Sequence, residues 1–164
     1  AALRMQSVDR WHIVNTTRRQ NLAEHSLNVG IIASRIATLM NLNRFEACYW
    51  GCIHDIEEVV VGDTPSHVKA MLRAKQADPV DLTGFMEVPD LYKPIVKIAD
   101  IMEACFWLQE SCGDSHAKQT LAWVTQRMNS RLASLNGDLK DAATVVLSEL
   151  RSGPYVEFDL AWQP

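Results

Sequence analysis

Ionisable side chains interrupt apolar helical segments at three places, and this pattern constrains the fold more than any other feature of the chain. The groups are His25, the pair His54-Asp55, and Asp100. Asp100 has the apolar residues Val96, Ala104 and Trp107 at helical spacing around it, so its carboxylate is expected to point inward. A lone carboxylate in that position is costly. The fold therefore has to bring these groups a partner.

Helical periodicity runs through most of the sequence. It predicts a helix over residues 22–40, which Asn21 caps and in which Glu24 completes a capping box. Further helices are predicted over residues 44–60, 66–75, 91–111, 115–135 and 138–151. Residues 76–90 are polar and contain Pro79, Gly84 and Pro89, which indicates a loop. We therefore predict an all-α helical bundle that forms a single domain over residues 1–164.

Charge and composition exclude several classes of partner. The chain has 164 residues and a formal net charge of −4, which argues against binding a nucleic-acid polymer because such surfaces need a basic stripe. No apolar run approaches the roughly 20 residues of a membrane span. The four cysteines include no CxxC pair, so we expect free thiols in a reducing compartment and a cytoplasmic protein.

A divalent cation would supply the missing partner. Imidazoles combined with carboxylates suit Zn, Co, Mn, Fe or Ni. Each group also has an ordinary structural interpretation: His25 as a packed or capping histidine, and Asp100 as half of a buried ion pair. The order His…His-Asp…Asp across three helices, followed by an acid at residue 58, is a much more specific signal than any one of them.

This pattern resembles the HD-domain metal-dependent phosphohydrolases. It is most similar to the short deoxynucleotide-hydrolysing branch, which includes the bacterial YfbR-type 5′-deoxynucleotidases and the phage DatZ-type dATP triphosphohydrolases. The matching residues are Arg10-Trp11, Glu24-His25-Ser26, His54-Asp55 with Glu58, Gly62-Asp63 with Pro65 and Lys69, and Lys97-Ile98-Ala99-Asp100. The resemblance covers residues 10 to about 110 and implies an HD-domain helical bundle.

The resemblance also implies roles for these residues. His25, His54, Asp55 and Asp100 would be metal ligands, and Glu58 would activate or orient the attacking water. The implied substrate contacts are Arg10, Trp11, Ile13, Asp63, Pro65, His67 and Lys69. Arg10 and Lys69 would hold phosphate oxygens, Trp11 would lie against the sugar or base, and Ile13 would face the base. His67 stands where relatives often have a second proline, and its contact is left open between the phosphate and the pocket wall.

The expected activity follows from the same comparison. The segment between Asp55 and Asp100 is short, as in the phage enzymes, so we expect a dATP triphosphohydrolase that releases deoxyadenosine and triphosphate and depletes dATP during phage infection. One alternative is a 5′-deoxynucleotidase acting on monophosphates, and another is a non-catalytic HD module that binds a nucleotide. The resemblance further implies a homo-oligomer in a bacterial or phage-infected cytoplasm.

Two further expectations concern Glu57 and the tryptophans. Glu57 lies beside Glu58, and spacing alone barely separates them, so we expect Glu57 to be solvated. Trp50, Trp107 and Trp123 fall at helical core spacing and are expected to pack in the interior.

Overall fold

The computed structural model describes residues 2–75 and 86–152, which form a bundle of helices with one very short ladder. The elements are η1 (Ala2–Ser7), β1 (Asp9–Arg10), β2 (Gln20–Asn21), α1 (Leu22–Leu39), α2 (Arg44–Ile53), α3 (Glu58–Val61), α4 (Ser66–Ala74), α6 (Lys93–Ser111), α7 (Ser115–Ser134) and α8 (Gly137–Ser152). The prediction of an all-α fold is confirmed. Part of the loop predicted over residues 76–90 lies outside the described residues.

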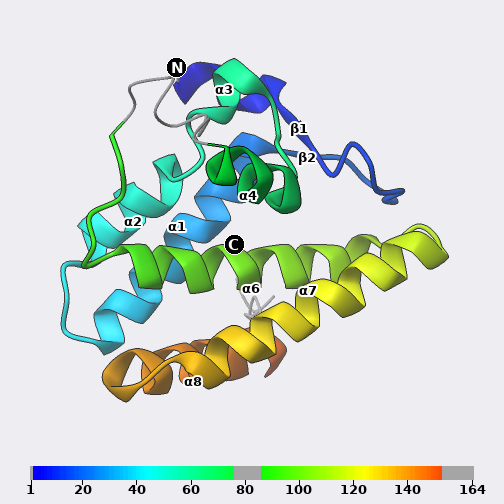
Figure 1. Ribbon diagram of the computed structural model, residues 1–164. Helices are drawn as coiled ribbons and strands as arrows, with labels where there is room; N and C mark the ends of the chain where they lie inside the picture. The colour runs from blue at the N-terminus through cyan, green and yellow to red at the C-terminus, as the bar shows by residue number, and fades with distance from the viewer. Residues whose placement is uncertain (1, 76–85, 153–164) are drawn as a thin grey trace, which may run out of the picture.

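Helix α6 is the central element of the bundle. It crosses the middle of the molecule and packs against both α1 and α7, while α8 lies against α1 and α7 (Figure 1). Its buried residues cover more than one face, including Ile95, Ile98, Met102 and Leu108. The middle of α6, residues 98–105, is almost entirely buried, so a polar side chain there, such as Glu103, lies inside the molecule. None of the helices in the described ranges combines the length and apolarity that a membrane crossing needs.

Two glycines bring α1 and α2 into close contact. A Cβ atom added to Gly51 would lie 2.6 Å from the Cα atom of Gly30, and one added to Gly30 would lie 2.6 Å from Cys52 Sγ. Neither position could accept a side chain without displacing its neighbour. His25 lies five residues before Gly30 and His54 three residues after Gly51. The close crossing therefore sets the separation of the two histidines.

The predicted cap of α1 is confirmed. The helix predicted over residues 44–60 begins at Arg44 as expected, but the prediction that it continues unbroken to residue 60 is wrong. Asn21 Oδ1 accepts a hydrogen bond from the backbone N–H of Glu24 at 2.9 Å. Helix α2, in contrast, ends at Ile53, and a tight turn leads into α3 at Glu58. In this turn the N–H of Glu58 bonds the carbonyl of Asp55, three residues back, which is tighter than α-helical pairing. The turn redirects every side chain that follows His54.

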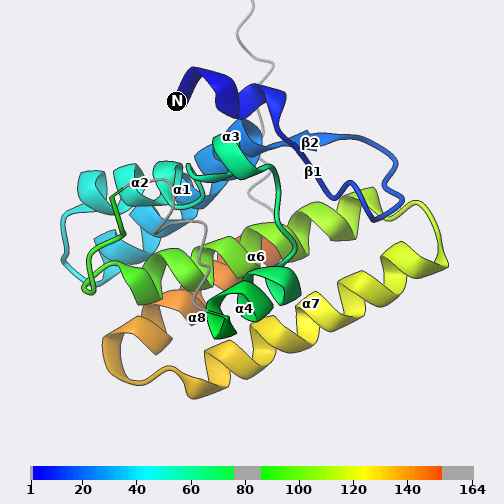
Figure 2. The same cartoon turned by 45° about the horizontal axis from the view of Figure 1, so that its top comes forward.

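A short antiparallel ladder stands beside the bundle. Strands β1 and β2 pair Arg10 with Gln20 and Asp9 with Asn21. The loop between them carries Trp11, whose φ of 60° lies in the left-handed region that non-glycine residues seldom adopt. The views in Figures 1 and 2 both place this hairpin at one end of the molecule, above α6. The ladder fixes the backbone positions from which the side chains of Arg10 and Trp11 project.

Candidate active site

The four predicted metal ligands converge from α1, the end of α2 and the middle of α6. Ligand atoms of His25, His54 and Asp55 all lie within 4.8 Å of one another. His54 Nε2 is 3.2 Å from Asp55 Oδ2. Asp100 Oδ1 reaches both rings, at 3.5 Å from His25 Nε2 and 4.0 Å from His54 Nε2. Residues up to 75 positions apart in the sequence thus meet at one point.

Both imidazoles are oriented by hydrogen bonds from their Nδ1 atoms. His54 Nδ1 lies 2.8 Å from the carbonyl oxygen of Gly51, which can only accept, so this nitrogen carries the proton. His25 Nδ1 lies 2.5 Å from Glu103 Oε2. The two Nε2 atoms are buried and have no hydrogen-bond partner among the described residues. Paired Nε2 atoms without partners, next to carboxylate oxygens, are the donor set that a divalent transition metal requires.

The two histidines titrate in opposite directions. Burial is the largest influence on His25, and together with the charge of Arg10 it lowers the pKa of that ring, which favours the neutral form that ligates metals. Burial also acts against the charged form of His54, but Asp55 and Asp100 outweigh it and raise its pKa to about 9. Because a metal ligand is the neutral ring, a divalent cation at this position competes with a proton on His54 Nε2.

Glu58 lies deep in the site and is only 1% exposed. Its Oε1 atom is 2.7 Å from Lys69 Nζ, and its Oε2 atom is 3.9 Å from Arg10 Nη1. Burial, followed by repulsion from Asp55, raises the pKa of Glu58 to about 8 against the attraction of the two cations. A carboxylate with its pKa near neutrality can exchange a proton at physiological pH, which suits a general base.

The expectation that Glu57 is solvated is wrong. Glu57 is 5% exposed, and its Oε1 atom is 3.4 Å from Lys69 Nζ. Lys69 Nζ also bonds Asp55 Oδ1 at 3.0 Å. One ammonium therefore contacts carboxylates of both glutamates and of Asp55. The tight turn after His54 causes this, because it points Glu57 and Glu58 inward together.

A cavity of about 670 Å³ opens beside this cluster. Its walls include most of the predicted site residues, namely Arg10, Trp11, Ile13, Asp55, Glu58, Asp63, Pro65, Lys69 and Asp100. His25 and His54 stand behind this wall, at 0% and 8% side-chain exposure. His67 belongs to α4, but its side chain lies outside the described residues. The volume is in the range of pockets that take a nucleotide-sized ligand.

Trp11 is fixed on one wall of this cavity. Its Nε1 atom donates to Gln20 Oε1 at 2.8 Å. Its ring is nearly parallel to the ring of Trp107, with an interplanar angle of 3° and 5.8 Å between the ring centres. These two contacts hold an otherwise unfavourable backbone conformation and fix the plane of the indole. A fixed aromatic plane is a suitable surface for a sugar or base.

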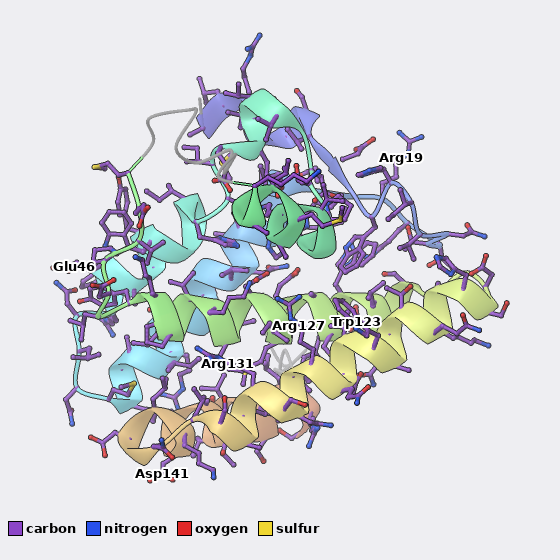
Figure 3. The ribbon with its side chains drawn as sticks, viewed as in Figure 1. Arg19, Glu46, Trp123, Arg127, Arg131 and Asp141 are labelled. Carbon is purple, nitrogen blue, oxygen red and sulfur yellow. The ribbon has the colours of Figure 1, made fainter. Side chains whose placement is uncertain are left out.

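Helix α7 forms one wall of the cavity, which the sequence did not predict. The α7 residues that line the cavity are His116, Gln119, Thr120, Trp123, Val124 and Arg127. Trp123 was expected in the core but is 52% exposed, and it lies on the pocket-lining face of α7 together with Arg127 (Figure 3). Trp107 is 3% exposed, as expected, and Trp50 packs half-buried against the core. Helical spacing gives the face of α7 but not whether that face packs or lines a pocket.

Comparisons with known proteins agree with this architecture. The family described as "5′-deoxynucleotidase YfbR-like" matches residues 1–78. A dATP triphosphohydrolase of Salmonella phage PMBT28 is 33% identical over 168 residues, covering 90% of this chain and 84% of the phage protein. The 5′-deoxynucleotidase YfbR of Salmonella paratyphi B is 29% identical, over 57% of this chain and 55% of that enzyme.

A solved structure shares the fold. The Cyanophage S-2L HD phosphohydrolase DatZ, bound to dA and one catalytic Zn²⁺ ion, superposes with a TM-score of 0.73 at 23% identity, covering 92% of this chain and 94% of the phage chain. The bundle and its His–Asp cluster thus define an HD-domain phosphohydrolase. Within that class, the chain belongs to the deoxynucleotide-hydrolysing family that includes the phage dATP triphosphohydrolases and YfbR.

Proposed function

We propose that the protein hydrolyses dATP to deoxyadenosine and triphosphate in a reaction that requires a divalent metal. The observation that carries this proposal is the cavity of about 670 Å³, which joins the His–Asp cluster and Glu58 to several cationic side chains. Arg10 and Lys69 lie at the cluster, and Lys97 and Arg127 also line the cavity. A triphosphate carries several negative charges that such a lining can neutralise.

His25, His54, Asp55 and Asp100 are the residues we propose to hold the metal. Their fit rests on the carboxylate oxygens 3.2–4.0 Å from the two Nε2 atoms, which have no hydrogen-bond partner in the part of the chain that the structure describes. When bound, a cation such as Zn²⁺, Co²⁺ or Mn²⁺ lowers the pKa of a coordinated water and neutralises phosphate charge. The His₂Asp₂ donor set is compatible with each of these ions.

In the proposed reaction Glu58 transfers protons, and Arg10 and Lys69 bind the substrate phosphate. Glu58 accepts a proton from the attacking water, whose oxygen bonds the α-phosphorus. The bond from that phosphorus to the 5′-oxygen breaks, and the 5′-oxygen takes up a proton from solvent water as deoxyadenosine leaves. Glu58 then returns its proton to solvent, which restores the enzyme. Arg10 and Lys69 now neutralise Asp55 and Glu58, at 2.7–3.9 Å. Substrate phosphate would share these cations, which are already positioned.

The nucleoside would occupy the part of the cavity between Trp11 and the turn before α4. Trp11 offers its fixed ring, and Ile13 is 57% exposed at the cavity. Asp63 and Pro65 stand on the facing segment, and Asp63 Oδ2 lies 3.3 Å from His12 Nδ1. We propose that Trp11 and Ile13 contact the base or sugar, and that Asp63 accepts a hydrogen bond near the 3′ side of the sugar. His67 remains a predicted contact.

A product assay tests the substrate. Protein loaded with Co²⁺ and incubated with dATP is expected to release deoxyadenosine and triphosphate in equal amounts, measured by chromatography. The expected kcat/KM for dATP exceeds that for dAMP by about tenfold or more, because one further favourable phosphate contact of about 1.4 kcal/mol gives that ratio. Protein treated with chelator serves as the control and is expected to be inactive.

Two other outcomes of this assay would contradict the proposal. Turnover of dAMP to deoxyadenosine and phosphate, without turnover of dATP, would identify a 5′-deoxynucleotidase, which the match over residues 1–78 favours as the second candidate. No product from either nucleotide, with nucleotide binding retained, would identify a non-catalytic binding module.

We further propose a homo-oligomer that acts in the cytoplasm of a bacterium or of an infected host. Large apolar side chains are exposed on α1 and α2, namely Leu27, Ile31, Phe45 and Tyr49. Leu27 and Ile31 are four residues apart on α1, and Phe45 and Tyr49 are four residues apart on α2, so each pair shares one helix face. Contiguous apolar surfaces commonly mark subunit contacts. Light scattering is expected to give a mass that is a multiple of 18.5 kDa. A mass of one chain at micromolar concentration would contradict the proposal.

A further inference from the structure

A buried hydrogen-bond chain connects the pocket tryptophan to a proposed metal ligand. Trp11 Nε1 bonds Gln20 Oε1 at 2.8 Å, Gln20 Nε2 bonds Glu103 Oε1 at 2.6 Å, and Glu103 Oε2 bonds His25 Nδ1 at 2.5 Å. Gln20 and His25 are 0% exposed and Glu103 is 4% exposed. Neither Gln20 nor Glu103 is among the site residues predicted from the sequence. The available signal was a carboxylate three residues after Asp100 in an apolar helix.

The direction of every bond in this chain follows from the chemistry of its ends. An indole N–H can only donate, so the amide oxygen of Gln20 faces Trp11 and its NH₂ group faces Glu103. Glu103 as a carboxylate can only accept, so the proton on His25 stands on Nδ1. The lone pair of His25 is then on Nε2, which faces Asp100. The chain therefore selects the tautomer that a metal needs.

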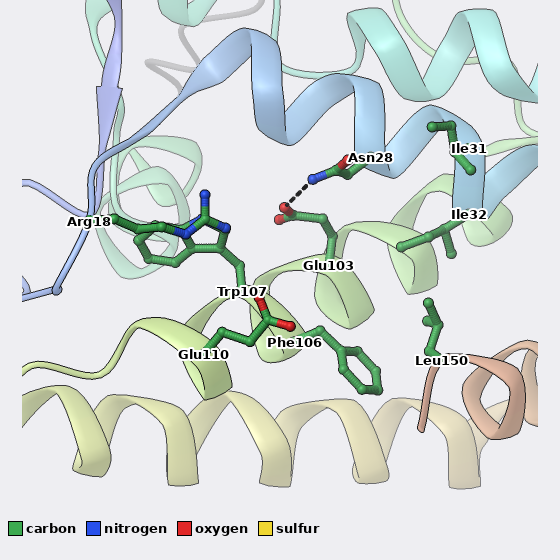
Figure 4. Close-up of a pocket in the computed structure, with 9 residues that line it drawn as sticks. All are labelled: Arg18, Asn28, Ile31, Ile32, Glu103, Phe106, Trp107, Glu110 and Leu150. Carbon is green, nitrogen blue, oxygen red and sulfur yellow. Dashed lines mark hydrogen bonds between the residues drawn. The ribbon is translucent and has the colours of Figure 1, made fainter. Parts of the chain in front are cut away.

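Glu103 also fixes the rotation of α1 against α6. Its Oε1 atom accepts a bond from Asn28 Nδ2 at 3.3 Å, which Figure 4 shows at the edge of a separate cavity. Asn28 lies three residues after His25, so both project from the same face of α1. A carboxylate on α6 thus holds two side chains of α1. This arrangement limits how far the His25 ring can move from the cluster.

We propose that Glu103 and Gln20 are positioning residues that hold His25 ready for the metal and couple its position to that of Trp11. This inference rests on the proposed metal site and adds two residues that do not touch the metal or the substrate. Groups that orient a ligating histidine commonly change metal affinity by about 10- to 100-fold when altered. Gln20 adds a second consequence, because its loss also releases the indole of Trp11.

The first test measures the metal affinity of the whole 164-residue chain. Zn²⁺ binding is measured by competition with a chromophoric chelator, and the visible absorption of bound Co²⁺ reports ligand geometry. Glu103→Gln is expected to weaken Zn²⁺ binding by about 10- to 100-fold and to change the Co²⁺ spectrum. The matched control is Glu110→Gln, an exposed position on the same helix, which is expected to match the wild type.

The second variant separates positioning from folding. Gln20→Met keeps the side-chain length, but its sulfur cannot donate to Glu103 and is only a weak acceptor for the indole N–H of Trp11. It is expected to weaken Zn²⁺ binding by a smaller factor than Glu103→Gln and to raise KM for the nucleotide more than it lowers kcat. If Glu103→Gln does not fold, as judged by circular dichroism, Gln20→Met carries the test.

Unchanged Zn²⁺ affinity and an unchanged Co²⁺ spectrum in a folded variant of either kind would overturn the inference. Failure of the metal proposal would look different. In that case His54→Ala would also bind Zn²⁺ as the wild type does.

Discussion

His54→Ala is expected to abolish stoichiometric metal binding and to lower activity by about 10³-fold or more. The substitution removes one of the two Nε2 atoms that face the cluster. Metal catalysis contributes several kcal/mol, and each change of about 1.4 kcal/mol corresponds to a tenfold change in rate. The measurements are metal content by emission spectroscopy and initial rates of nucleotide hydrolysis.

The matched control for this substitution is His116→Ala. His116 also lines the cavity, but it lies on α7 and is exposed. It is expected to keep full metal content, because it lies on α7 and is not among the proposed ligands. Equal metal content in His54→Ala and the wild type would show that the cluster is not the metal site.

Glu58→Gln is expected to lower kcat by about 10²- to 10⁴-fold while metal content and KM change little. This range is typical for the loss of a general base. Glutamine matches the shape of Glu58 but cannot accept the proton of the attacking water. Steady-state kinetics and metal analysis on the same preparation separate this effect from metal loss. A kcat within about threefold of the wild type would remove Glu58 from the mechanism, since a general base contributes far more than that.

The same substitution is expected to stabilise the metal-free protein at alkaline pH. Asp55, Arg10 and Lys69 face Glu58, and the balance of burial and charge raises its pKa from 4.5 to about 8. Between these values the native protein holds a proton that the unfolded chain has released. The free energy of unfolding therefore falls as pH rises through this window. The amide of the Glu58→Gln variant does not titrate, so this variant should melt at a higher temperature than the wild type at a pH just above that window, in the presence of chelator.

The helical segments were predictable because their signals are local. Asn21 and Asn43 accept hydrogen bonds from N–H groups two or three residues further along the chain. The apolar spacing of α1 likewise lies within one continuous segment. The exception is the turn after His54. The apolar run Val59–Val61 continues the helical pattern, so nothing in the sequence indicates that the helix ends at Ile53. In the structure the helix breaks there, and Glu57 and Glu58 both contact Lys69.

The proposed ligands could be predicted because burying an ionisable group without a partner costs free energy. A carboxylate such as Asp100 inside an apolar helix requires a partner, and the order of His25, His54-Asp55 and Asp100 matched a known pattern. Glu103 stands in the same helix with the same apolar surroundings but was overlooked. Its partners, Gln20 and His25, are 83 and 78 residues away, and no spacing rule connects them.

The sequence by itself determined which ionisable side chains need a partner inside the fold. They are two histidines and two aspartates in apolar helices, with an acid four residues after His54. Only the tertiary structure decided what surrounds them: the Gly30–Gly51 crossing, the inward turn of Glu57, the α7 wall with Trp123, and the chain from Trp11 to His25. The physical reason is the separation along the sequence of the residues that interact. Caps and periodicity act over a few residues, whereas these contacts form only when distant segments pack together.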